Sequence, residues 1–248
     1  MADASTSKFI GKALIVSEDA VITRQLVAAL EELALSVEVC IKIGDALEHV
    51  NHSKFEVGVV DFSLGSNAKR FLEQMRASAS NRTAVAFAIT GNSLETASAL
   101  KAGSSFVLER PLTSESIRNT LNAAYGMIVR ERRRYFRYPI SVPAAGSRKG
   151  ESELFGRTIN VSERGMALST STPVMPGSEL KIQFTLPNPR LDVTADCKVC
   201  WHNEEGHVGL SFLFLPSNLS SELQAWLAQK LEEQLPEVVV QRFQPSPR

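Results

Sequence analysis

The sequence predicts two domains of different fold class: an α/β, doubly wound, five-stranded parallel sheet, and then a six-stranded antiparallel β-barrel with a C-terminal helix. Three observations lead to this prediction. The chain has 248 residues, of which 44% are hydrophobic, so it is long and apolar enough for two packed cores. Short apolar runs alternate with helical patterns in the first half. After Pro139, short alternating runs are separated by turn residues.

The first half contains five strand-like runs, each followed by a segment with helical spacing of its apolar residues. The expected strands are ALIV (13–16), SVEVC (36–40), VGVVD (57–61), AVAFAIT (84–90) and SFVLE (105–109). The expected helices follow at 21–35, 44–52, 68–78, 93–103 and from Ser114 onward. This alternation predicts a parallel sheet covered on both faces, with ligands beyond the carboxyl ends of its strands.

Polar residues stand at those strand ends: Asp61 after the third strand, Thr90 after the fourth and Arg110 after the fifth. Together with Ser17 and Glu18 after the first strand, they make residues 9–126 resemble a response-regulator receiver domain. The resemblance implies that Asp61 is a candidate phosphoacceptor and that Thr90 contacts the phosphoryl oxygens. It also implies a lysine at the position of Arg110 and two magnesium-binding acids where Ser17 and Glu18 stand.

The departures from that pattern favour a degenerate receiver. Mg²⁺ requires near-octahedral oxygen ligation, and Ser17 removes one expected carboxylate, so we expect no Mg²⁺ there. Arg110 keeps the positive charge of a lysine but not its compact geometry. The alternative interpretation of Asp61, an acid that is hydrogen-bonded to its own loop, remains open.

The fifth helix of the first half has an unbroken apolar stripe, formed by Ile117, Leu121, Ala124 and Ile128. Its N-cap is expected at Thr113 or Ser114. The stripe serves either packing within the chain or a homodimer. We expect this helix to run toward Arg133 and to end before Pro139, because the residue that precedes a proline disfavours helix.

The second half shows six strand-like runs with turn signals between them, which is typical of a closed barrel. The runs are ISVPAA (140–145), ELFGRTIN (153–160), GMALST (165–170), SELKIQFTL (178–186), LDVTADCKVCW (191–201) and HVGLSFLFL (207–215). A terminal helix with its apolar face at Leu219, Leu223, Trp226, Leu227 and Leu231 could cap the barrel. The expected boundaries are a first domain at 1–126, a linker and arginine arm at 127–137, a barrel domain at 138–235 and a flexible tail at 236–248.

The stretch RERRRYFRYP (130–139) has five arginines in ten positions, although the formal net charge of the chain is zero. About two dozen residues later, NVSERG (160–165) forms a polar turn between two expected strands. An Arg-x-x-x-Arg arm, a six-stranded barrel, an Asn-x-Ser-x-x-Gly turn and a later VGLSF strand together resemble the PilZ domain. The resemblance covers residue 130 to about residue 235.

PilZ domains are receptors for the bacterial second messenger cyclic di-GMP, and the resemblance implies this ligand. It implies that Arg133, Arg134 and Arg137 form the ligand arm, and that Asn160, Ser162 and Gly165 form the second motif. Guanidinium groups match both phosphates and the N7/O6 fork of guanine. Ser162 is expected to donate to a phosphate, Asn160 to contact a base or sugar, and Gly165 to let the ligand approach the backbone. Arg130 and Arg132 are expected to be the solvated end of the helix.

The remaining patterns argue against other functions. The balanced charge, with 27 basic and 27 acidic residues, argues against nucleic-acid binding, and no apolar run is long enough for membrane insertion. Cys197 and Cys200 are three positions apart in an expected strand, which puts their side chains on opposite faces, so we expect neither a metal site nor a redox pair. No triad-like spacing of nucleophile, base and acid occurs, and we expect no enzyme and no cofactor. The cysteine usage suits reduced thiols in a cytoplasm, and the resemblance to the PilZ domain implies a bacterial one.

We therefore expect a cytoplasmic cyclic di-GMP receptor whose arm becomes ordered on ligand binding and changes its contacts with an unidentified protein partner or between domains. Two alternatives remain from the sequence. The barrel could be a protein-interaction adaptor that binds no nucleotide. Phosphorylation of Asp61 could instead gate the output of the second domain.

Overall fold

The computed structural model describes residues 11–147 and 154–234. The chain forms two compact units, which divide between Arg132 and Arg133, inside the last helix of the first unit. The expected boundary at residue 126 lies six residues earlier, and the expected tail at 236–248 lies outside the described residues. We describe each unit by itself.

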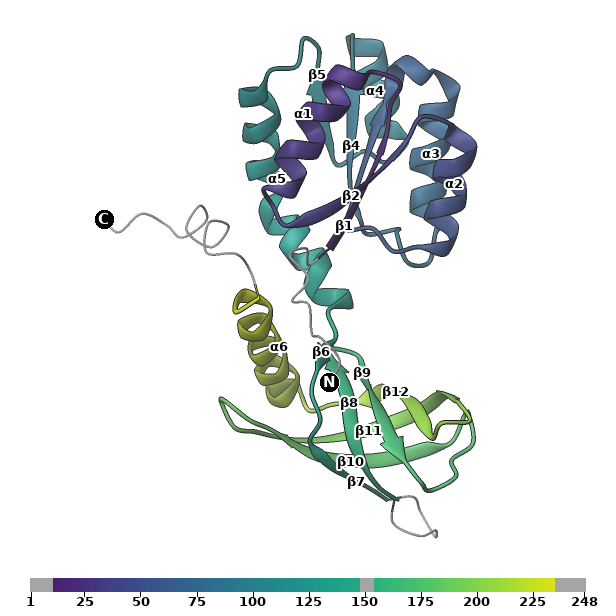
Figure 1. The fold of residues 1–248 in the computed structure, drawn as a ribbon, viewed down its shortest axis with the longest axis vertical. Helices are drawn as coiled ribbons and strands as arrows, with labels where there is room; N and C mark the ends of the chain where they lie inside the picture. The colour runs from purple at the N-terminus through teal and green to yellow at the C-terminus, as the bar shows by residue number, and fades with distance from the viewer. Residues whose placement is uncertain (1–10, 148–153, 235–248) are drawn as a thin grey trace, which may run out of the picture. The chain divides into compact units, whose positions relative to one another are not determined.

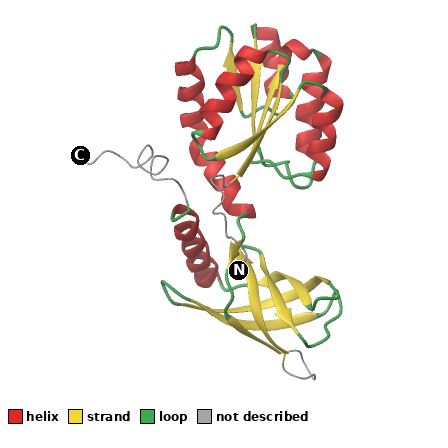
Figure 2. Ribbon diagram, viewed as in Figure 1, coloured by secondary structure: helices red, strands yellow, loops and turns green. Residues whose placement is uncertain are grey.

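The first unit is a five-stranded parallel sheet with the strand order β2-β1-β3-β4-β5 (Figures 1 and 2). Its strands are β1 (Gly11–Val16), β2 (Leu35–Cys40), β3 (Val57–Asp61), β4 (Val85–Thr90) and β5 (Phe106–Glu109). Its helices are α1 (Ala20–Glu31), α2 (Ile43–His52), the short η1 (Phe62–Leu64), α3 (Ser66–Ala77), α4 (Ser93–Lys101) and α5 (Ser114–Tyr135). The strand order reverses between β1 and β3, which places a ligand crevice at their carboxyl ends in this fold class.

Two separate apolar cores confirm that the sheet is covered on both faces. One core contains the buried side chains of α1 and α5, and the other contains those of α2, α3 and α4. The stripe of α5 is buried in the first of these cores. The stripe therefore packs within the chain, which removes it as a dimer surface.

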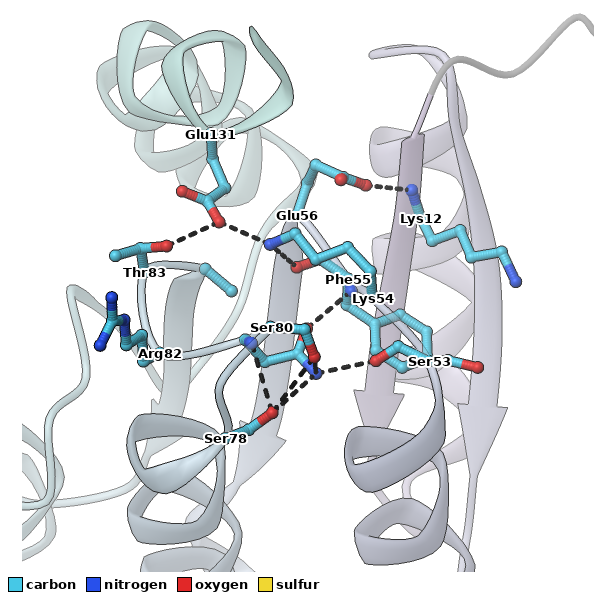
Figure 3. A network of polar contacts seen from close by, with 12 residues as sticks. Lys12, Ser53, Lys54, Phe55, Glu56, Ser78, Ser80, Arg82, Thr83 and Glu131 are labelled. Atoms are coloured by element: carbon cyan, nitrogen blue, oxygen red, sulfur yellow. Dashed lines mark hydrogen bonds and ion pairs between the residues drawn. The ribbon is translucent and has the colours of Figure 1, made fainter. Parts of the chain in front are cut away.

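The last turn of α5 differs from the prediction. Glu131 and Arg132 are each only 3% exposed. Glu131 accepts hydrogen bonds from Lys54 Nζ and from Thr83 Oγ1, the latter at 2.9 Å (Figure 3). Arg132 Nη2 donates to the carbonyls of Leu33 and Ala34, at 2.7 and 3.0 Å. The expectation that Arg132 is solvated was wrong, because its guanidinium group is buried and its Nη2 donates to backbone carbonyls of the first unit, although its Nε has no hydrogen-bond partner among the described residues.

The second unit is a closed antiparallel barrel, as predicted. Its strands are β6 (Tyr138–Pro139), β7 (Pro143–Ser147), β8 (Leu154–Ser162), β9 (Gly165–Thr170), β10 (Glu179–Leu186), β11 (Leu191–His202) and β12 (His207–Phe214). The ring runs β8-β7-β10-β11-β12-β9 and closes through the pairing of β8 with β9, while β6 adds to β8. The inward-facing residues of the six ring strands form a single core.

Helix α6 (Ser217–Glu232) closes the barrel core, as its apolar face predicted. Leu223, Trp226 and Leu227 are buried members of that core. The indole Nε1 of Trp226 donates to the carbonyls of Pro187 and Pro189, at 3.0 and 3.1 Å. Tyr138 of β6 meets the edge of the Trp226 ring, with the ring centroids 5.2 Å apart. The terminal helix thereby packs beside the strand that follows the arginine arm.

The cysteine pair on β11 also has the predicted geometry. Cys197 is buried and Cys200 is exposed, so the two thiols lie on opposite faces of the strand. Burial, and to a smaller extent the charge of Asp196, raises the pKa of the Cys197 thiol to about 12. The two sulfur atoms could not bind one metal ion together.

Across residues 11–147 and 154–234, no helix has both the length and the apolar content that a membrane span needs.

Candidate ligand-binding site

The backbone brings the two sequence motifs of the second unit together. Strand β6 pairs with the end of β8, with Tyr138 opposite Val161 and Pro139 opposite Asn160. Arg137 directly precedes β6, and Asn160 and Ser162 lie in the last three residues of β8. The arginine arm and the polar turn are therefore neighbours, although more than twenty residues separate them in the chain.

The arm itself is mostly the last turn of α5 and not an extended segment. Arg133 and Arg134 are helical and half-buried, whereas Arg137 follows the helix and is exposed. The helix can run this far because no proline lies between Pro111 and Pro139. Three guanidinium groups thus lie within one helical turn and its exit.

The second motif is a tight hairpin. Ser162 ends β8, Glu163 and Arg164 form a two-residue loop, and Gly165 begins β9. The Ser162 hydroxyl is buried and donates to the carbonyl of Gly165 at 2.8 Å. In this structure the proton of Ser162 therefore holds the hairpin, which differs from the expected donation to a phosphate. The hydroxyl oxygen retains its acceptor capacity.

The structure explains the glycine at position 165 by strand packing and not by the expected approach of a ligand to the backbone. A Cβ atom at this position would lie 2.1 Å from the carbonyl oxygen of Leu210 on β12. No side chain fits at that distance, because the obstacle is backbone. The glycine is required for the close approach of β9 to β12, before any ligand is considered.

Two polar atoms at this site are buried and have no hydrogen-bond partner among the described residues. They are Asn160 Oδ1 and Arg133 Nε. Buried polar groups in native proteins are almost always satisfied, so such atoms call for a ligand, an ion or water. They belong to the two motifs that the sequence analysis selected.

Two acidic side chains accompany the arginines, and the sequence analysis missed both. Glu232, at the end of α6, pairs with Arg133 at 3.2 Å between Oε1 and Nη2. Burial raises the pKa of the Glu163 carboxyl above its usual range, and the charges of Arg164, Arg133 and Arg134 oppose that rise. The sequence signal that could have identified Glu163 was the charged pair of Glu163 and Arg164 within the NVSERG motif. Nothing in the sequence pairs Arg133 with Glu232, which is 99 positions away.

The first unit holds the other predicted site, at the carboxyl ends of β1 and β3. Asp61 is fully buried, and its Oδ2 pairs with Arg110 Nη2 at 2.6 Å and accepts a hydrogen bond from Ser17 Oγ at 3.0 Å. Its Oδ1 accepts from the backbone N–H of Ser63 at 3.0 Å. Asp61 is thus hydrogen-bonded to its own loop, as the alternative interpretation of this acid expects, and it also forms an ion pair with Arg110.

The remaining predicted residues of that site are not all directed toward Asp61. Glu18 is exposed, and the Thr90 hydroxyl lies 3.0 Å from the hydroxyl of Thr96. Asp19, which the sequence analysis did not select, pairs with Arg110 at 3.3 Å and caps α1.

This donor set does not fit Mg²⁺, because one guanidinium group binds both Asp61 and Asp19. No cluster of three or more metal-binding side chains occurs within the described parts of the chain.

Comparisons with known proteins identify one family and several similar structures. The PilZ domain family matches residues 131–229. No curated protein matches the sequence. Among solved structures, the receiver domain of a sensor histidine kinase from Pseudomonas aeruginosa is similar, with a TM-score of 0.42 and 20% identity over 47% of this chain and 98% of that chain.

Two further structures are similar. The chemotaxis response regulator CheY4 of Vibrio cholerae has a TM-score of 0.42 and 18% identity, and covers 46% of this chain and 97% of its own. The inhibitor of motility from Bacillus subtilis has a TM-score of 0.35 and 14% identity, and covers 39% of this chain and 50% of its own. Response-regulator receiver domains are thus structural neighbours of the N-terminal half.

Proposed function

Because residues 131–229 form a PilZ domain, the fold of cyclic di-GMP receptors, we propose that this chain binds cyclic di-GMP between the arginine arm and the Asn160 turn. The pairing of β6 with β8 carries the proposal, since it puts Arg137 beside the turn that begins at Asn160. The two unsatisfied atoms, Asn160 Oδ1 and Arg133 Nε, supply an acceptor and a donor for such a ligand.

The chemistry of each side chain suits part of this ligand. Arg133, Arg134 and Arg137 can hold phosphate oxygens or the N7/O6 edge of guanine through paired N–H donors, and their planar groups can stack on a base. Asn160 Oδ1 can accept from a guanine N–H or from a ribose hydroxyl. Ser162 and Gly165 keep the hairpin in shape around these contacts.

Binding is expected to act on α5, because the arm and this helix are continuous. Arg133, a proposed ligand contact, directly follows Glu131 and Arg132 in the chain. Buried hydrogen bonds within the first unit hold these two residues in place. We infer that ligand binding immobilises the arm and changes contacts between the units or with a protein partner. This is the behaviour of an effector and not of an enzyme.

We assign the protein to the bacterial cytoplasm. All three cysteines are thiols, which suits a reducing compartment. We assign no phosphorylation-gated output to Asp61. Its Oδ2 atom already pairs with Arg110 and accepts a hydrogen bond from Ser17. The buried, arginine-paired carboxylate has the geometry of a structural ion pair.

Calorimetric titration of the full chain with cyclic di-GMP tests the proposal. We expect binding at micromolar protein, and we expect Arg137→Ala to weaken it roughly 10- to 100-fold, since charge-assisted hydrogen bonds contribute about 1.5–3 kcal/mol each.

Arg130→Ala is the matched control, because Arg130 is an exposed arginine on α5 outside the arm. It should bind like the wild type. The proposal fails if the wild type gives no binding heat, or if Arg137→Ala binds as tightly as the control.

A further inference from the structure

The arginine arm is already accompanied by carboxylates from two other elements. Glu232 of α6 pairs with Nη2 of Arg133. Glu163 lies in the hairpin loop, where it interacts with the charges of Arg133 and Arg134 on α5 and of Arg164 beside it. Glu163 occupies a variable position within the Asn-x-Ser-x-x-Gly turn, and Glu232 lies outside both motifs.

We propose that Glu163 and Glu232 are intramolecular counter-ions of the arginine arm, with which an anionic ligand must compete, and that they thereby set the affinity and the anion selectivity of the site. This inference rests on the proposed function, because cyclic di-GMP is the anion concerned. Its two phosphates bring as many negative charges as the two carboxylates with which they compete.

The geometry of Arg133 supports the exchange at Glu232. The Nε and Nη2 atoms form one edge of the guanidinium group, which matches two oxygens of a single phosphate or carboxylate. Glu232 uses Nη2 alone, and Nε is buried without a partner among the described residues. A phosphate on this edge would satisfy both donors, whereas Glu232 satisfies one.

The exposure of that ion pair makes it replaceable. The side chains of Arg133 and Glu232 are 38% and 57% exposed. An ion pair this exposed contributes little to stability, because water screens the two charges and both long side chains lose conformational freedom when they pair. Glu232 can therefore hold the arm in the absence of ligand without preventing its release.

Glu163 acts by charge. It is partly buried next to the arginines, so an ionised carboxylate there repels a phosphate that binds the same groups. Burial raises the pKa of this carboxyl. As the pH falls through that raised pKa, Glu163 becomes neutral and the repulsion disappears. Affinity for a phosphodiester, which stays anionic over this range, should then increase.

The charged groups that interact with Glu163 are Arg164 from its own loop and Arg133 and Arg134 from α5, and Arg133 also pairs with Glu232 of α6. The arginines keep their charge throughout this pH range. The pH dependence that the proposal requires therefore belongs to the Glu163 carboxyl and not to its arginine partners.

Isosteric variants of the full chain test the inference by titration with cyclic di-GMP. Glu232→Gln should bind up to about fivefold tighter than the wild type, as expected for release of an exposed ion pair. Glu163→Gln should bind up to about tenfold tighter at pH 8, where the native carboxylate is charged, and should show a smaller gain in affinity than the wild type as the pH is lowered to about 4.5, near the ordinary pKa of a glutamate.

Glu233→Gln is the matched control. Glu233 lies next in sequence to Glu232 and also forms an ion pair, but with the buried Lys230 of α6, at 2.8 Å. It should leave affinity unchanged. The inference is overturned if wild type binds and neither glutamine variant binds tighter, or if the control gains as much. If the wild type does not bind at all, the proposed function itself fails.

Discussion

Gly165 shows how a motif residue can act through packing before it acts on a ligand. Its hydrogen faces the carbonyl oxygen of Leu210 at a distance where no methyl group fits. The neighbouring Ser162 gives its proton to the Gly165 carbonyl. At the scale of single residues, both therefore shape the hairpin, while Asn160 and Arg133 are left with unsatisfied atoms.

Gly165→Ala should destabilise the barrel by about 1–3 kcal/mol, the usual cost of overpacking, because β9 and β12 must separate to admit the Cβ. Urea unfolding followed by tryptophan fluorescence measures this effect, since Trp201 and Trp226 are the two tryptophans of the chain and both belong to the barrel unit.

Gly126→Ala is the control for that substitution. A Cβ at Gly126, on the exposed side of α5, would meet nothing within 4 Å. This change should be neutral or stabilising by about 0.5–1 kcal/mol through helix propensity. Equal unfolding midpoints for Gly165→Ala and the wild type would show that the close approach of β9 to β12 does not constrain the barrel.

At the scale of elements, α5 is the most informative segment. Its stripe is buried in the core of the first unit, and its last turn holds two buried charged residues, Glu131 and Arg132. Lys54 and Thr83 donate to Glu131 (Figure 3). The backbone carbonyls of Leu33 and Ala34 accept from Arg132. The arginine arm therefore directly follows two residues of α5 that buried hydrogen bonds hold in place.

Glu131→Gln should lower the stability of the first unit by about 1–3 kcal/mol, because it removes the charge that accepts from Lys54 and Thr83 in a buried setting. Far-UV circular dichroism during urea unfolding reports this loss, since five of the helices belong to the first unit. Tryptophan fluorescence should report an unchanged barrel, which contains both tryptophans.

Glu115→Gln, an exposed acid in the first turn of the same helix, should leave both signals unchanged. A Glu131→Gln protein as stable as this control would contradict a structural role for the buried network. A loss seen by fluorescence alone would also contradict it.

At the scale of the whole molecule, the sequence was sufficient for what depends on periodicity and on short motifs. Alternating apolar runs predicted the parallel sheet, and even spacing of short strands predicted the barrel. The arm and the turn were predicted as one site, and the pairing of β6 with β8 makes them neighbours. The sheet and the barrel depend on a repeated pattern, and the joint site depends on two short motifs that the resemblance to the PilZ domain connects.

What the sequence could not predict depends on contacts between distant residues. Charged residues in an arginine-rich helix end look solvated, so the burial of Arg132 against the carbonyls of Leu33 and Ala34 was missed. The contact of Gly165 with Leu210 and the pairing of Arg133 with Glu232 likewise join separate elements. Periodicity carries no information about such pairs.

The central claim is that one molecule of ligand contacts the arm and the turn together. A calorimetric double-mutant cycle with cyclic di-GMP tests it, using Arg137→Lys, which keeps the charge but loses the paired donors, and Asn160→Ala. We predict micromolar or tighter binding by the wild type, weaker binding by each variant, and a loss in the double variant that is smaller than the sum of the single losses. Absence of binding by the wild type, or losses that add to within about 0.5 kcal/mol, would contradict the account.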